Sequence, residues 1–130
     1  MADKWTAIQS LWSSFGLPAY DENTVPDEVW DEAQQKMIPI EPPYITYAAS
    51  VADFDTMVYL TASIWYRSSS WAEVSQKAEE ISNLIGGGMG VPYDGGRLWV
   101  VKASPFAQRL ADESDGQIRR IVLQTTGEFQ

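Results

Sequence analysis

Adjacent carboxylates are the first feature of this sequence that could do chemistry. Paired acids can act as general acid and base, and they can bind a hard cation such as Ca²⁺. These pairs fall in predicted loops or on an exposed helix face, and they lack the ligand spacing of a calcium-binding loop. Because Asp and Glu are rarely buried, we interpret them as solvated surface charge. The pairs are Asp21–Glu22, Asp27–Glu28, Asp31–Glu32 and Asp112–Glu113.

Serines and glycines offer the next candidate sites. Ser68–Ser70 could supply a nucleophile, but a hydroxyl needs a base, and although a Ser–Lys pair is conceivable, no lysine is singled out. Helix capping is the stronger interpretation of these serines. Gly86–Gly88 opens a glycine-rich stretch that follows a predicted helix, whereas phosphate-binding loops precede one. We interpret this stretch as a flexible connector.

Two residue types are missing from the chain, which contains no cysteine and no histidine. Their absence excludes disulfides, thiolate zinc sites, nucleophiles paired with histidine and imidazole acid–base catalysis. We therefore expect a non-enzymatic protein with no catalytic residues, no bound cofactor and no metal site. An assembly or binding role remains.

The composition is that of one acidic globular domain, residues 1–130, in which 45% of the residues are hydrophobic. Its 18 acids and 9 bases give a net charge of −9, so we expect no sequence-specific binding of nucleic acid. No apolar run approaches the roughly 20 residues that span a membrane, and the N-terminal residues lack the layout of a signal peptide. We expect no membrane association and a cytosolic location.

Two segments have the periodicity of an amphipathic helix. Residues 4–15 place apolar side chains at helical spacing, and Gly16 and Pro18 end this segment. A second helix is predicted to follow Ser70, which forms a capping box with Glu73, and to end where the glycine-rich stretch begins. Its apolar stripe consists of Trp71, Val74, Ala78, Ile81 and Ile85.

A proline-rich arm at about residues 17–43 follows the first helix. Pro26 and the two acids after it are typical of the first turn of a helix. The sequence therefore predicts a short helix over residues 27–37. The apolar residues that would share one face of this helix are Trp30, Ala33 and Met37.

The remaining elements are strands. Pro105 cannot donate to a strand ladder, so pairing should be interrupted there, and residues 108–112 either resume the strand or form a bulge. Short turns between strands favour hairpins. The order of elements predicts an α/β (α+β) fold with a four-stranded, mainly antiparallel sheet and two main helices packed on one face. The first predicted strand begins at residue 43, and the other three cover residues 57–67, 97–104 and 117–126.

The strand predicted over residues 57–67 has two contrasting faces. Alternate apolar residues from Val58 to Tyr66 should face the core, while the other face carries aromatic and charged side chains. Large aromatics fill cores or are enriched at protein–protein interfaces. The adjacent arginines of the last strand point to opposite faces, so either one pairs with acids of a neighbouring subunit or both are surface residues. The candidate subunit-interface residues are Tyr59, Trp65, Arg67, Arg119 and Arg120.

Five segments carry a resemblance to a known family. They are FGLPAYDENTVP (15–26), PYITY (43–47), LTASIWYRS (60–68), SPFAQR (104–109) and IRRI (118–121). In this order they resemble small structural proteins of tailed phages and prophages of Gram-positive bacteria, of the tail terminator type, which are also labelled minor capsid proteins. The resemblance extends over nearly the whole chain. Residues 27–41 are an insertion relative to these proteins.

The resemblance implies a subunit that assembles into a ring, commonly a hexamer, on the end of the tail tube. Such a ring stops tube polymerisation and presents a surface to the head. The implied partners are further copies of the chain, the tail tube protein and the head-completion or connector protein. The implied location is the virion, with the host cytoplasm during assembly. A head–tail joining (neck) role and a non-viral protein-binding adaptor domain stay open, because fold alone does not separate them.

Overall fold

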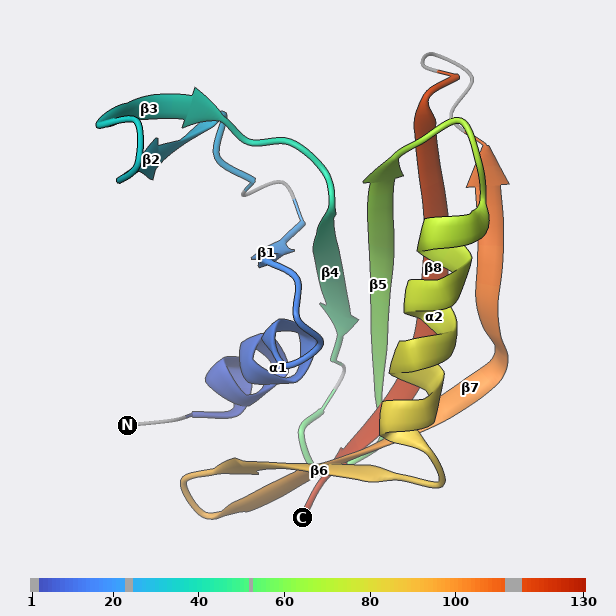
Figure 1. The fold of residues 1–130 in the computed structure, drawn as a ribbon. Helices are drawn as coiled ribbons and strands as arrows, with labels where there is room; N and C mark the ends of the chain where they lie inside the picture. Colours follow the sequence, from blue (N-terminus) through green and yellow to red (C-terminus); the bar gives the residue numbers. More distant parts are fainter. Residues whose placement is uncertain (1–2, 23–24, 52, 112–115) are drawn as a thin grey trace.

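The computed structural model describes residues 3–22, 25–51, 53–111 and 116–130 of the chain. Within them the backbone forms two helices and eight strands (Figure 1). In chain order these are α1 (Lys4–Ser13), β1 (Ala19–Asp21), β2 (Glu28–Asp31), β3 (Lys36–Pro39), β4 (Tyr44–Ser50), β5 (Val58–Arg67), α2 (Ala72–Ile85), β6 (Met89–Tyr93), β7 (Gly96–Ala111) and β8 (Ile118–Phe129).

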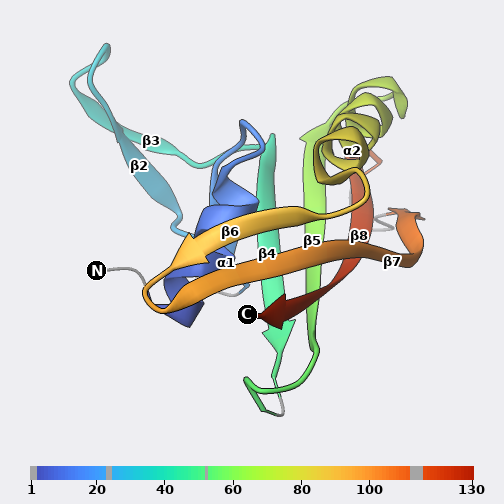
Figure 2. The same ribbon diagram turned by 90° about the horizontal axis from the view of Figure 1, so that it is seen from below.

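Six strands form one mixed sheet in the order β1-β4-β5-β8-β7-β6. All of its neighbouring strands are antiparallel except β1 and β4, which are parallel. The sheet is curled, and Figure 2 shows β6 and β7 crossing over β4 and β5. The predicted four-stranded sheet with two main helices is therefore wrong, because the fold is mostly β. The prediction missed the two edge strands of this sheet. Both are short, since β1 has three residues and β6 has five, so neither has a clear alternating pattern.

The glycine-rich stretch is an edge hairpin rather than a flexible connector. β6 contains Pro92, which an edge strand tolerates because one side of its backbone has no strand partner. A two-residue turn of Asp94 and Gly95 joins β6 to β7, and Gly95 has a φ of +110°. At Gly88, which precedes β6, a Cβ atom would lie 2.0 Å from the ring of Trp99. The glycines thus permit a turn and a close approach that side chains would block.

The arm contains a second hairpin in place of the predicted helix over residues 27–37. β2 and β3 pair antiparallel, with Trp30 opposite Met37. The side chain of Asp31 organises the turn, because its two carboxylate oxygens accept hydrogen bonds from the Ala33 amide (2.9 Å) and from the Gln34 side chain (2.8 Å). The apolar residues of the arm have a spacing that also fits one face of a helix, which explains the wrong prediction. The hydrogen bonds of the Asp31 side chain stabilise a turn there instead.

The pairing of β7 with β8 is interrupted as predicted. The register shifts between Lys102 and Ala107, around Pro105. Before the shift Val100 lies in the core, and after it Arg109 lies opposite the buried Ile121. The shift therefore changes which alternate residues of β7 face the core.

Both helices form near their predicted positions. Asp3 caps α1, and its side chain accepts a hydrogen bond from the Thr6 amide (2.7 Å), which is the main reason that the pKa of Asp3 lies below its ordinary value. The capping box predicted at the start of α2 is wrong. Trp71 occupies the N-cap position, and Ser70 instead accepts a hydrogen bond from the Ala72 amide. Neither helix is long and apolar enough to cross a membrane, as far as the described residues extend.

One hydrophobic core joins the two helices to a single face of the sheet. The alternation predicted in β5 is confirmed, since Val58, Leu60, Ala62 and Ile64 are buried, although Tyr66 is only partly buried. Within the described part of the chain, no helix covers the opposite face of the sheet (Figures 1 and 2). The buried residues of the helices are Ala7, Ile8, Leu11, Trp12, Val74, Ala78, Ile81 and Ile85.

Candidate subunit interface

The sheet face opposite the helices carries a row of large side chains across four strands. The strand register places Tyr44 opposite Trp65, Trp65 opposite Arg120, and Arg120 opposite Leu110. The guanidinium carbon of Arg120 lies 4.7 Å from the centre of the Trp65 ring, in cation–π geometry. Two of the predicted interface residues, Trp65 and Arg120, are therefore brought together in one aromatic and cationic row, which we call the outer row (Tyr44, Trp65, Arg120 and Leu110).

Hydrogen bonds fix the side chains at the centre of the outer row. Trp65 Nε1 donates to Thr46 Oγ1 (2.9 Å), and Arg120 Nε donates to the hydroxyl of the buried Ser63 (3.0 Å). The members of the row are half-buried, so part of each side chain remains accessible to a partner. Side chains held in one conformation lose little further entropy when they bind, which suits a contact surface.

Arg119 lies on the other face of β8 and has an internal role. Its guanidinium carbon is 5.4 Å from the ring centre of Trp71, and its Nη atoms donate to the carbonyls of Ser69 (2.9 Å) and Gly116 (2.8 Å). These contacts hold the segment that enters α2. The opposite orientation of the two adjacent arginines was predicted correctly, and the structure does not bring Arg119 into the outer row.

The other two predicted residues lie at the ends of β5. Tyr59 is 57% exposed and shares a strand face with Trp65, about 20 Å away along the strand. Arg67, at the opposite end, is exposed and has a partner within the chain. They extend the face of the outer row lengthwise.

A second surface was missed by the sequence analysis. A cleft of about 350 Å³ lies between α2 and the part of β7 after the register shift. Its lining includes Ala78, Phe106 and Ile121, with Arg109 beside them. Arg109 stacks 5.1 Å from the ring centre of Trp71 and donates to Ser75 Oγ. The cleft depends on which residues of β7 face α2 after the register shift. The sequence left open whether the strand resumed there or formed a bulge.

The acidic pairs that the structure describes form no metal-binding cluster. Among the residues that the structure describes, no cluster of three or more acids could hold a metal ion. Asp31 organises a turn, while Asp112–Glu113 lies outside the described residues. The pKa of Tyr66 is raised by burial and, to a smaller extent, by Glu73 and Glu80, which keeps its hydroxyl protonated.

Comparison with known proteins gives a likeness at the level of fold. Neither a family model nor a curated protein sequence matches the chain. The chain is similar in structure to a chain from the virion of a native gene transfer agent particle, with a TM-score of 0.60 and 20% sequence identity. The match covers 94% of this chain and 83% of that chain. It extends over nearly the whole chain.

Proposed function

We propose that this chain is a structural, non-enzymatic subunit of a phage-type virion, and specifically a tail terminator. The observation that carries the proposal is the likeness to a gene transfer agent virion chain over 94% of the present chain. The sequence segments that resemble tail terminators support the same assignment independently of the fold. In this role the protein acts in the virion and is assembled in the host cytoplasm.

The proposed mechanism is assembly into a ring, commonly of six subunits, on the end of the tail tube. A ring subunit needs two different surfaces that meet head to tail around a closing rotation. The outer row, with its fixed side chains, is a candidate for one such surface. The partners of the ring are the tail tube protein on one side and the head-completion or connector protein on the other. When the ring binds the end of the tail tube, it would block the surface to which the next tube subunits add, and polymerisation would stop.

The acidity of the chain suits a channel through which DNA passes. A net charge of −9 repels phosphates, so DNA would move through the lumen without adhering to it. Purified protein should accordingly show no tight, salt-sensitive binding to duplex DNA in a gel-shift titration. Such binding would contradict this part of the proposal.

Deletion of the gene tests the assignment directly. Loss of a tail terminator removes the stop to polymerisation, so we expect over-long tails in electron micrographs of the lysate. Complementation with the wild-type gene is the control and should restore a single tail length. Tails of normal length beside full, unattached heads would instead assign a head–tail joining role. Virions of normal number and form would overturn both assembly roles and favour an adaptor function.

A further inference from the structure

The β2–β3 hairpin carries an apolar pair that the hairpin itself leaves open to solvent. Trp30 and Met37 lie opposite each other and are 48% and 51% exposed. The hairpin projects away from the six-stranded sheet (Figures 1 and 2). An isolated two-stranded hairpin is at best marginally stable in water, so an exposed aromatic–aliphatic pair at this position indicates cover by another molecule.

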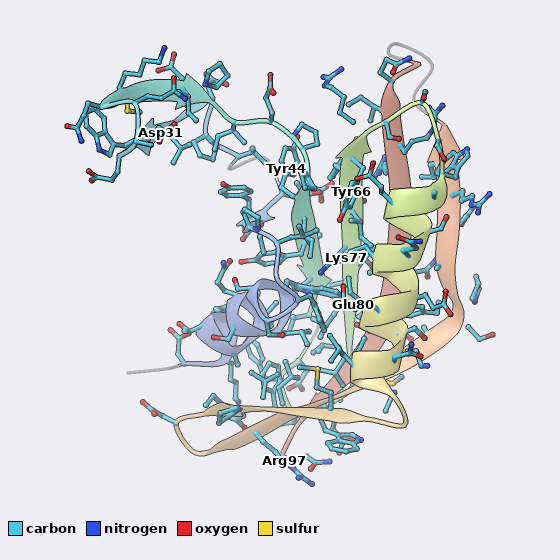
Figure 3. All side chains as sticks on the ribbon, viewed as in Figure 1. Asp31, Tyr44, Tyr66, Lys77, Glu80 and Arg97 are labelled. Atoms are coloured by element: carbon cyan, nitrogen blue, oxygen red, sulfur yellow. The ribbon has the colours of Figure 1, made fainter. Side chains whose placement is uncertain are left out.

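The hairpin is also strongly acidic. Residues 27–41 contain five carboxylates and one lysine, which gives the segment a net charge of −4. Asp31 stands at the end of β2 beside the turn, where Figure 3 labels it on the projecting hairpin. A surface that covers this hairpin should therefore combine an apolar floor with positive charge.

The α2–β7 cleft has this combination. Its floor is made by Ala78, Phe106 and Ile121. Two bases lie along it: Arg109 lines the cleft, and Lys102 sits 5.9 Å from the ring centre of Phe106. One acid, Glu79, also lines the cleft.

We propose that the hairpin of one copy of this chain docks into the α2–β7 cleft of a second copy. The Trp30–Met37 pair covers the apolar floor, and the acids at the hairpin turn face Arg109 and Lys102. The occupant is a second copy because one chain carries both halves of the contact, matched in polarity and opposite in charge. Arg109 is already held by Ser75, so its charge is positioned before the partner arrives.

The positions of the two halves suit a ring. In both ribbon views the hairpin lies on one side of the molecule, and α2 and the end of β7 after the register shift lie on the other (Figures 1 and 2). A contact between them is therefore heterologous and repeats from subunit to subunit. This inference rests on the proposed ring and adds to it the segment that joins neighbouring subunits.

Disulfide trapping tests the contact, because the chain contains no cysteine of its own. One sample carries Gln34→Cys at the hairpin turn, and a second, of different mass through a tag, carries Glu79→Cys at the cleft. When the two samples are mixed and oxidised, a disulfide-linked heterodimer should form. Its mass, which is the sum of the two different chain masses, identifies it. The matched control replaces Glu79→Cys by Ser10→Cys, an exposed position on α1, and should give little heterodimer.

The second measurement compares the self-association of two tryptophan variants. Trp30→Ala should weaken self-association at least about tenfold, as expected for a tryptophan at the centre of a contact. Trp5→Ala is the matched control, since Trp5 is 55% exposed but lies on α1, and it should leave self-association unchanged. Melting temperature is measured for both variants, so that loss of folding is distinguished from loss of contact.

The outcomes separate this inference from the proposed function. Preferential trapping together with weakened association of Trp30→Ala supports the hairpin contact. Normal self-assembly without trapping, or with Trp30→Ala unaffected, overturns the hairpin contact and leaves the ring in place. Absence of both trapping and self-association, in solution and on tail tubes, overturns the hairpin contact and the ring together.

Discussion

Two tryptophans show how differently single residues contribute to this fold. Trp12 is fully buried under α1 and packs against Phe15, with ring centres 5.9 Å apart. Trp71 is only partly buried and lies between the guanidinium groups of Arg109 and Arg119. The first residue fills the core, whereas the second joins the start of α2 to the ends of β7 and β8.

This difference predicts unequal losses of stability. Trp12→Ala should lower the free energy of unfolding by about 3–5 kcal/mol, because it leaves a cavity in the core. Trp71→Ala should cost less, about 1–2 kcal/mol, since it removes partly exposed area and two cation–π contacts. Urea denaturation of both variants measures the two values. Equal losses would contradict the assignment of Trp71 to the rim of the core.

At the scale of elements, β8 is closely packed at Gly127 against side chains of both neighbouring strands, β5 and β7. A Cβ atom at Gly127 would lie 2.9 Å from a methyl of Leu98 and 3.0 Å from a methyl of Leu60. Both leucines are fully buried, so neither can move aside freely. The core therefore requires a glycine at this position in β8.

Gly127→Ala should consequently destabilise the protein by about 1–3 kcal/mol, the usual cost of overpacking a core. Gly116→Ala is the control, because a Cβ atom there has no atom within 4 Å in the described structure. Thermal unfolding followed by circular dichroism compares the two. A melting temperature of Gly127→Ala equal to that of the control would show that the strands can separate without cost.

Elements with strong periodicity and clear ends could be predicted from the sequence. The helix at residues 4–13, the alternation of β5 and the break at Pro105 all depend on local pattern, and all three were found. The edge strand β1 could not be predicted, because it has three residues and is held by pairing with the distant β4. β6 pairs with the adjacent β7, but it contains Gly90 and Pro92, residue types that are depleted in strands. The hairpin at residues 28–39 was missed because a turn outweighed an apparent helical spacing.

The candidate interface was predicted in part for the same reason. Alternation along β5 placed Trp65 on the face away from the core, which needs no knowledge of its neighbours. Its contact with Arg120 depends on the register between β5 and β8, which one sequence does not contain. The orientation of Arg109 toward α2 depends on the register shift in β7, so the cleft could not be predicted from the sequence.

At the scale of the whole molecule, the exposed apolar side chains lie on several sides rather than in one patch. They occur on α1, the arm, the β5 end of the sheet and α2. Apolar side chains scattered singly over a surface are normal in a monomer, so the indication of a covered surface comes from Trp30 and Met37, which lie opposite each other on the hairpin. The large apolar residues more than 40% exposed are Trp5, Val29, Trp30, Met37, Met57, Tyr59 and Leu84.

The mass of the purified protein over a concentration series tests the central claim, that this chain is a ring-forming assembly subunit, most directly. Light scattering and native mass spectrometry should find a discrete species near six times 14.5 kDa, either free in solution or when isolated tail tubes are added. Electron microscopy of the tubes should then find the protein at one end only. A monomer at every concentration that also fails to bind tube ends would contradict the claim.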